Sequence, residues 1–253
     1  MVGLGTVGYP TAHYICDHGY RVYGYDIRSI NSEHFFTTAN WKDIPNDVEA
    51  YVIAVSSGLD GEKPDLTSFY EVCSRISSSS HNALVCMEST VPVGTCRKLA
   101  SEFDLPNFVH VPHRYWSKKP EKRGVRQLRV FGALDKSSYA KGLRFYEQLD
   151  IPLYKVSKIE IAEMSKIAEN AYSFVQIAFA ESLKMACENL ELDFDSVRRA
   201  CNTKWNIKLW KALEGIGGIC FPKDIRYLLH LAPSDPLLKG AILVDNEYKK
   251  SRK

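Results

Sequence analysis

A single cysteine lies between a glycine cluster and a charged pair in the last fifth of this chain. Cys220 follows residues 215–218, three of which are glycines, and Lys223 and Asp224 come within one helical turn. A thiol is a good nucleophile as thiolate, which nearby cations and helix N-termini favour. Glycines let the backbone approach a substrate, and their N–H groups can face an oxyanion. Taken alone, the pattern equally fits a turn before a helix that holds an inert, buried cysteine.

The start of the chain carries a glycine motif that is typical of dinucleotide binding. Gly3, Gly5 and Gly8 have the spacing G-x-G-x-x-G, a helical pattern follows over residues 6–18, and a short strand is expected over residues 21–26. In such folds the first glycine allows a tight turn, the second admits the pyrophosphate, and the third lets the helix pack on the strand. The phosphates lie at the helix N-terminus, where free N–H groups and the dipole favour anions.

The expected strand after this helix ends in an acid that bears on the choice of cofactor. Asp26 lies roughly 20 residues beyond the motif, where a carboxylate binds the ribose hydroxyls. It favours NAD over NADP, although Arg28 nearby weakens that preference. Almost nothing precedes Gly3, so we expect the first strand to be very short or truncated.

Composition and charge exclude several classes of protein. The net charge of +3 over 253 residues implies no nucleic-acid or acidic-membrane partner. No apolar run approaches the ~20 residues of a membrane span, and the N-terminus lacks a signal-peptide pattern. The seven cysteines form no C-x-x-C pair. We therefore expect reduced thiols in a cytoplasmic compartment and no metal site.

The first half of the chain alternates short apolar strands with helices. Strands are expected over residues 50–55, 83–88, 108–111, 129–133 and 152–156, and helices over residues 65–76, 92–103 and 135–149. This order predicts a Rossmann-like, doubly wound parallel sheet with ligands at the carboxyl ends of its strands. We therefore expect an α/β, NAD-binding domain over residues 1–157.

The second half is expected to be all-helical, with one long helix. Residues 158–192 contain neither glycine nor proline, which predicts a helix of roughly 50 Å. Its middle, residues 171–180, is apolar nearly all round and must be buried on several sides, so we expect a homodimer across it. Shorter helices are expected over residues 195–201, 222–231 and 236–248, completing a central domain over residues 158–253.

Two further groups of polar residues could take part in chemistry. Lys166 and Asn170 lie one turn apart on one face of the long helix, although an ordinary surface lysine and its neighbour would look the same. Ser89 and Thr90 follow a buried strand and so reach the carboxyl edge of the sheet, unless they only cap the helix that Pro92 begins. The residues expected to contact the cofactor are Gly3, Gly5, Thr6, Val7, Gly8, Asp26, Arg28, Val55, Ser56, Ser89, Thr90 and Lys223.

In combination these motifs resemble the UDP-glucose/GDP-mannose dehydrogenase family, the NAD-dependent nucleotide-sugar 6-dehydrogenases. Four segments occur in the family's order, at residues 3–8, 88–94, 166–170 and 217–224, and residues 202–204 also fit its central domain. The resemblance covers nearly all of the chain. It implies NAD as cofactor, a sugar or sugar-nucleotide as substrate, and a dimeric enzyme similar to UDP-glucose 6-dehydrogenase.

The resemblance also implies a reaction and roles for individual residues. A primary alcohol is oxidised to an acid in two hydride transfers that use two NAD. Cys220 would attack the aldehyde to form a thiohemiacetal, and the resulting thioester would be hydrolysed by water. Lys166 and Asn170 would stabilise the oxyanion, Asp224 would act with a water as base, and Thr90 would help to position that water.

Three features depart from the family pattern. The family places glutamates after the strand over residues 108–111, whereas His113 and Ser117 stand there in this chain. His113 is a candidate substitute base, although a lone histidine is more often structural. The connection over residues 27–48 is shorter than the family's, and the chain ends where a third, nucleotide-gripping domain would begin. The expected substrate contacts or possible base are His113, Gly217 and Gly218.

Two other functions also fit the sequence. A one-step β-hydroxyacid dehydrogenase would share the two-domain plan and the lysine of the long helix, but it needs no cysteine. A non-catalytic, NAD-binding or regulatory homologue would account for the missing glutamates. The joint presence of Cys220, Lys166, Asn170, Lys223 and Asp224 favours the enzyme.

Overall fold

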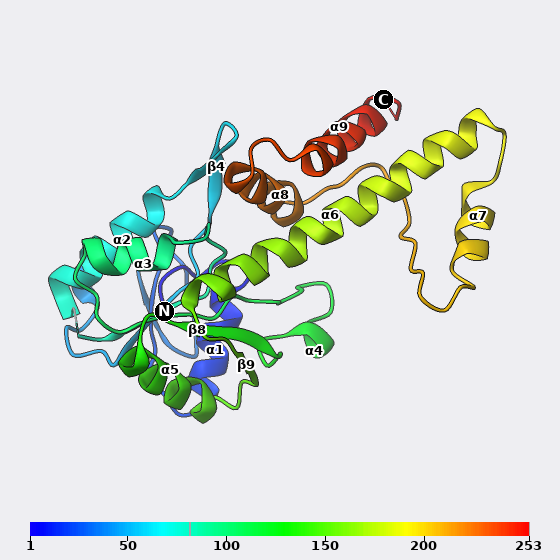
Figure 1. Cartoon of the computed structure of the whole chain (residues 1–253). Helices are drawn as coiled ribbons and strands as arrows, with labels where there is room; N and C mark the ends of the chain where they lie inside the picture. Colours follow the sequence, from blue (N-terminus) through cyan, green and yellow to red (C-terminus); the bar gives the residue numbers. More distant parts are fainter. Residues whose placement is uncertain (81, 253) are drawn as a thin grey trace. The chain divides into compact units, whose positions relative to one another are not determined.

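The structure, a computed structural model, describes residues 1–80 and 82–252 (Figure 1). Its contacts divide it into two compact units. The first comprises Met1–Gly58 and Asp65–Lys166, and the second comprises Leu59–Pro64 and the chain from Ile167 onward. The sequence predicted a domain boundary after residue 157. A division into contact units does not test a domain boundary, so that boundary stays a prediction.

The first unit is built on a twisted sheet in which parallel strands predominate. The strands are β1 (Tyr23–Tyr25), β2 (Phe36–Thr38), β3 (Ala50–Ile53), β6 (Leu84–Met87), β7 (Phe108–His110), β8 (Arg129–Ala133) and β9 (Leu153–Lys155). The order β3-β6-β7-β8-β9 forms one sheet, and β1 pairs with β2. The Rossmann-like fold expected from the sequence is confirmed.

Two strands, β8 and β9, run in the direction opposite to that predicted for a wholly parallel sheet. β8 runs antiparallel to β7, whereas β9 is parallel to β8. A parallel return needs a crossover of a dozen or more residues, usually an α-helix. The segment between β7 and β8 holds only the four-residue helix α4 (Pro120–Arg123), so β8 returns in the opposite direction.

The residues before the glycine motif join the two parts of this sheet. Val2 forms parallel bridges to Tyr25 on one side and to Ile53 on the other. The Met1 amine donates to the Tyr23 carbonyl at 2.8 Å. Val2 thus takes the place expected for the first strand and leads directly into Gly3.

Helices cover both faces of the sheet, each over its own core. On one face lie α2 (Thr67–Ser80) and α3 (Thr95–Glu102), and on the other lie α1 (Gly8–Asp17) and α5 (Lys136–Gln148). Strand β6 shows the alternation: Val85 and Met87 join the first core, and Leu84 and Cys86 join the second. Because β6 is buried on both faces, its sequence is uniformly apolar.

The second unit is helical apart from a small hairpin. Its helices are α6 (Ile159–Asn189), which begins in the first unit, α7 (Phe194–Cys201), α8 (Cys220–Leu231) and α9 (Pro236–Lys250). The predicted long helix is confirmed. Ala171, Phe174 and Ala178 on α6 form a core with residues of α8 and α9. No helix in the described ranges is long and apolar enough to cross a membrane.

Several short elements had not been predicted. They are β2, the 3-10 helix η1 (Trp41–Asp43), α4, and the hairpin of β4 (Gly58–Asp60) and β5 (Lys63–Asp65). The hairpin tip belongs to the second unit, where Glu62 pairs with Arg226 of α8 at 2.9 Å. Elements of three or four residues leave too little periodicity in a sequence to be recognised.

Candidate active site

The glycine motif has the geometry that a pyrophosphate requires. Gly3 has φ +88°, and a Cβ there would lie 2.7 Å from the Ala54 carbonyl oxygen. A Cβ on Gly8 would lie 1.9 Å from the Gly3 carbonyl oxygen. A Cβ on Gly5 would meet no atom of the described chain within 4 Å. Gly3 and Gly8 are therefore required for packing, whereas Gly5 leaves open space beside the first turn of α1, into which Thr6 and Val7 lead.

Asp26 follows β1 directly and is fully engaged by neighbouring donors. Its Oδ2 accepts from the Leu4 N–H at 2.8 Å and from Arg28 Nη2 at 3.1 Å. Its Oδ1 accepts from Arg28 N and Nε, both at 2.9 Å. Burial alone would raise the pKa of Asp26, but the hydrogen bonds from Arg28 and Leu4 outweigh it and lower the pKa. The Arg28 side chain is 63% exposed, so it can move aside for a ribose.

The segment after β6 is fixed by contacts other than the expected helix cap. Ser89 Oγ donates to the Val55 carbonyl at 2.7 Å, and Ser56 beyond it is exposed. Helix α3 begins only at Thr95, so the idea that Ser89 or Thr90 caps a helix from Pro92 is wrong. The caps come instead from buried Glu163 of α6, which accepts from Gly94 N at 2.6 Å and from Cys96 N at 2.8 Å.

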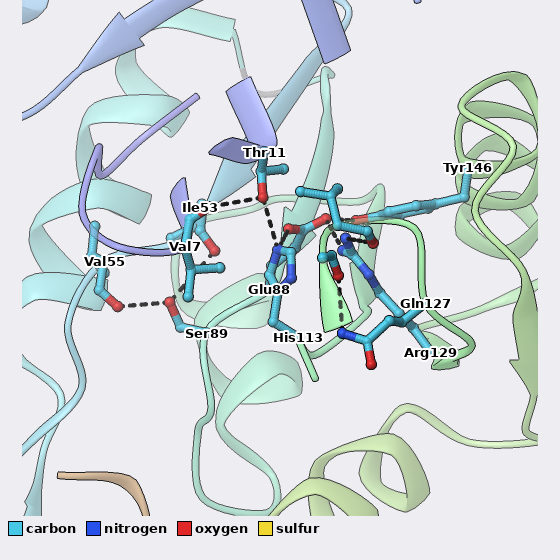
Figure 2. Close-up of polar contacts among 12 residues, drawn as sticks. Val7, Thr11, Ile53, Val55, Glu88, Ser89, His113, Gln127, Arg129 and Tyr146 are labelled. Atoms are coloured by element: carbon cyan, nitrogen blue, oxygen red, sulfur yellow. Dashed lines mark hydrogen bonds and ion pairs between the residues drawn. The ribbon is translucent and has the colours of Figure 1, made fainter. Parts of the chain in front are cut away.

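A buried charge network lies at the carboxyl ends of β6 and β7 (Figure 2). Glu88 Oε1 accepts from Arg129 Nη1 at 2.9 Å and from Tyr146 Oη at 2.7 Å. Glu88 Oε2 lies in direct contact with His113 Nε2. Burial would raise the pKa of Glu88, but Arg129 and His113 outweigh it and lower the pKa to about 2. The carboxylate therefore stays ionised at neutral pH.

His113 has one ring nitrogen engaged and the other bare. Its Nε2 lies 3.1 Å from Thr11 Oγ1, whose own hydrogen is donated to the Val7 carbonyl. The hydroxyl must then accept, which assigns the proton to Nε2. Nδ1 is buried and has no hydrogen-bond partner in the described ranges. Burial, followed by the charge of Arg129, lowers the pKa of His113, so the ring is neutral at pH 7 with Nδ1 as an unused acceptor.

In the second unit the structure brings three of the expected site residues together. Asp224 is fully buried; its Oδ2 accepts from Asn170 Nδ2 at 2.5 Å, and its Oδ1 accepts from Lys223 Nζ. The Lys223 ammonium also lies 4.1 Å from the centre of the Tyr227 ring. A buried carboxylate with two donors is satisfied, and it links α6 to the first turns of α8.

Cys220 is the first residue of α8, one turn before Asp224, and it is exposed. The alternative of an inert buried cysteine is therefore wrong. Gly218 has φ +77°, and a Cβ on Gly217 or Gly218 would meet no described atom within 4 Å. The thiol thus stands exposed at the start of a helix, beside open backbone. All seven cysteines are free.

Lys166 lies on α6 one turn before Asn170. Its charge is close enough to two buried histidines, His110 and His113, to lower the pKa of both, after the larger effect of burial. No group of three or more potential metal ligands occurs in the part of the chain that the structure describes.

Three residues of these networks were missed in the sequence: Glu88 as an ionised centre, its partner Arg129, and Glu163. Each is a charged residue inside or beside an apolar run. Charged residues are rarely fully buried unless paired, so two such positions of opposite sign predict a buried pair. That signal was present for Glu88 and Arg129, which are 41 residues apart.

Comparisons with known proteins agree with the residues that carry the resemblance. UDP-N-acetyl-D-mannosamine dehydrogenase of Pyrococcus horikoshii is 27% identical over 93% of this chain and 64% of its own length. NDP-N-acetyl-D-galactosaminuronic acid dehydrogenase of Ralstonia nicotianae is 26% identical over 94% of this chain and 66% of its own length. The solved structure of the Pyrococcus horikoshii enzyme superposes with a TM-score of 0.89 at 26% identity, covering 98% of this chain and 68% of that one.

The chain therefore spans just under two thirds of the length of these curated relatives. Residues 160–245, which include α7, α8 and most of α6 and α9, match the central domain of the UDP-glucose/GDP-mannose dehydrogenase family. The resemblance expected from the sequence is confirmed: residues 160–245 match that family's central domain, and the similar proteins are named nucleotide-sugar dehydrogenases.

Proposed function

We propose that this protein is an NAD-dependent dehydrogenase that oxidises the primary alcohol of a nucleotide-linked sugar to a uronic acid in two steps. The observation that carries the proposal is the cluster in the second unit. An exposed thiol at the start of α8 stands one turn from Asp224, which Asn170 and Lys223 hold in place. A nucleophile beside fixed donors is the arrangement that covalent aldehyde oxidation needs.

The residues of the first unit fit NAD. The open space at Gly5 suits the pyrophosphate, the first turn of α1 supplies N–H groups, and Asp26 suits the ribose hydroxyls once Arg28 moves aside. When bound, NAD supplies the hydride acceptor for both oxidations. Val55, Ser56, Ser89, Thr90 and Lys223 stay predictions as cofactor contacts.

Cys220 is the proposed nucleophile that forms the covalent intermediate. After the first oxidation its sulfur adds to the aldehyde carbon, and the carbonyl oxygen becomes the hydroxyl of a thiohemiacetal. Loss of hydride from that carbon and of the hydroxyl proton gives a thioester. Water then cleaves the C–S bond, which releases the acid and restores the thiol. Lys166 and the second N–H of Asn170 are proposed to stabilise the oxyanions of these steps.

Two groups are candidates for the base in hydrolysis. Asp224 is ionisable but fully engaged by Asn170 and Lys223, so it would act through a water that Thr90 helps to position. His113 is neutral with a bare Nδ1, and Glu88 at Nε2 would stabilise the charge that the ring acquires. We favour His113, because its acceptor nitrogen has no competing partner in the described ranges.

The names of the relatives indicate the substrate to try first. They are named UDP-N-acetyl-D-mannosamine dehydrogenase and NDP-N-acetyl-D-galactosaminuronic acid dehydrogenase, both after nucleotide-linked N-acetyl sugars. We therefore propose a nucleotide-linked 2-acetamido sugar as substrate, with Gly217 and Gly218 against it, and keep UDP-glucose as the alternative. A homodimer through α6 is also proposed, since Tyr172 and Phe179 on this helix are 65% and 61% exposed.

The test mixes the protein with NAD and a panel of UDP- and GDP-sugars and counts NADH formed per sugar. Two NADH per sugar are expected for the full route. A ratio of one would mean arrest at the aldehyde, whereas two NADH per enzyme in a single turnover with no acid released would mean arrest at the thioester. No NADH with any sugar, despite measurable NAD binding, would contradict the proposal.

Replacing the thiol separates this function from a one-step dehydrogenase. Cys220→Ser should abolish the second oxidation, with a loss of about 1000-fold or more in NADH formed from added aldehyde, because a hydroxyl is a far weaker nucleophile. Cys201→Ser, an exposed cysteine on α7, is the control and should keep full activity. A β-hydroxyacid-type enzyme would keep its activity in both variants.

One observation favours a second candidate, a non-catalytic NAD-binding homologue. His113 stands where the family has a glutamate, and it is buried in a network with Glu88 and Thr11. If that network is only structural, the thioester would not be hydrolysed. His113→Asn distinguishes the two: the enzyme should then accumulate the acyl form, whereas a binding protein would bind NAD unchanged.

A further inference from the structure

The loop that precedes Cys220 is held by α9 through two charged side chains. Asp245 Oδ1 accepts from the Ile216 N–H at 2.8 Å, and Lys249 Nζ donates to the Ile216 carbonyl at 2.8 Å. Both backbone groups of one loop residue are thus satisfied by a single helix. Asp245 and Lys249 also pair with each other at 2.7 Å, one turn apart.

The loop backbone is shaped to fit this pair. Gly215 has φ +100°, and a Cβ there would lie 2.4 Å from Lys249 Cγ, so the lysine stem crosses directly over the glycine. The Ile216 side chain is buried in the core formed by α6, α8 and α9. Two residues before Gly215, the Leu213 carbonyl accepts from Tyr248 Oη at 2.7 Å. Only residues 217–219 remain between these anchors and Cys220, and all three are exposed.

A second acidic residue makes the Asp245–Lys249 pair sensitive to change. Glu181 of α6 is fully buried, and neither of its carboxyl oxygens has a hydrogen-bond partner in the described part of the chain. The charge of Asp245 disfavours ionisation of Glu181, and that of Lys249 favours it. Lys249 therefore supplies the positive charge near two buried carboxyl groups, those of Asp245 and Glu181. Its removal would leave Asp245 buried without a counter-charge.

We infer that Asp245 and Lys249 are positioning residues that hold the glycine loop and thereby set the reactivity of the Cys220 thiol. The inference rests on the proposed role of Cys220. The route is short: the pair fixes Ile216, Ile216 fixes the start of the loop, and the loop sets the first turn of α8. Because Cys220 is already exposed, loosening the loop cannot make it much more accessible, but it disorders the first turn of α8 that carries the sulfur.

The test measures the rate at which iodoacetamide alkylates Cys220 in the full chain, read at the single peptide by mass spectrometry. Lys249→Met keeps the length of the side chain and removes its charge, and it should slow alkylation about threefold or more. Lys249→Arg should restore most of the rate, since it can donate to the same carbonyl. Lys250→Met, an exposed neighbour on α9, is the matched control and should not change the rate.

Cys201 provides an internal reference, because it is exposed and should react equally in all variants. Should Lys249→Met fail to fold, Asp245→Asn keeps an acceptor for Ile216 and weakens only the link to Lys249, so a smaller slowing is expected. An unchanged or faster Cys220 rate in the folded variants, or failure of Lys249→Arg to recover it, would overturn the inference.

The readout needs neither NAD nor sugar. If no sugar is oxidised but alkylation still depends on Lys249, the proposed function fails and the positioning role stands. If two NADH are formed per sugar and the alkylation rate does not depend on Lys249, the proposed function stands and the positioning role fails.

Discussion

Two fully buried glutamates, one in each unit, have opposite ionisation behaviour. Glu88 is held by Arg129, Tyr146 and His113, and its pKa falls to about 2. Glu181 has no hydrogen-bond partner in the described ranges, and burial, reinforced by Asp245, raises its pKa to about 7. Burial is the same for both, so the difference lies in their partners.

The two glutamates contribute to stability over different ranges of pH. Glu88 contributes stability above its unfolded-state pKa near 4.5, and that contribution is lost as pH falls through about 2. Glu181 binds its proton more tightly when folded. Its contribution is full below a pH near 4.5 and is lost as pH rises through about 7. Glu88 thus carries a permanent charge at the edge of the sheet. Glu181, which interacts with the residues that anchor the glycine loop, carries a charge that depends on pH.

The largest expected effect comes from removing the cation beside Glu88. Arg129→Met leaves a buried, uncompensated carboxylate and should lower the free energy of unfolding by about 3–5 kcal/mol at pH 7, measured by urea denaturation. Arg126→Met is the matched control, since its pair with Asp150 is 60% and 70% exposed, and it should lower the free energy of unfolding far less. An equal decrease in the free energy of unfolding in the two variants would contradict the idea that Arg129 compensates a buried charge.

A smaller, pH-dependent effect is expected at Glu181. The Glu181→Gln variant cannot ionise, so relative to the natural protein it should gain about 1–2 kcal/mol in stability between pH 4.5 and pH 8. Urea unfolding at several pH values measures this difference. A difference that stays constant across the range would show that Glu181 finds a partner that satisfies its charge.

The smallest effect is expected at Asp26, whose cation is exposed. Arg28→Ala should leave the free energy of unfolding nearly unchanged, because a solvent-exposed partner contributes little. It should also tighten NAD binding by about two- to threefold, since two acceptor positions on Asp26 become available to the ribose. Fluorescence titration with NAD checks this, and weaker NAD binding in the variant would contradict the assignment.

The sequence predicted what depends on local pattern. The glycine motif, the alternating elements and the long helix follow from residue spacing, and so did the placement of Cys220 before a helix. The contacts that hold them could not be predicted in the same way. Glu163 caps a segment 69 residues earlier, and the direction of β8 depends on how an irregular connection returns. Such long-range pairs leave little local periodicity.

His113 shows a second limit of sequence pattern. Its position after β7 marked it as a possible base, but the pattern could not say which ring nitrogen is protonated. That depends on Thr11, 102 residues away, and on the Val7 carbonyl that takes the hydroxyl hydrogen.

The most direct test of the proposed chemistry is to trap the covalent intermediate. The protein is incubated with NAD and the nucleotide-linked 2-acetamido sugar, quenched in acid and digested, and the peptide that contains Cys220 is weighed. We expect an acyl adduct on Cys220, enriched in His113→Asn and absent from Cys220→Ser. Sugar oxidised to the acid with no adduct on Cys220, and with equal turnover in Cys220→Ser, would contradict the account.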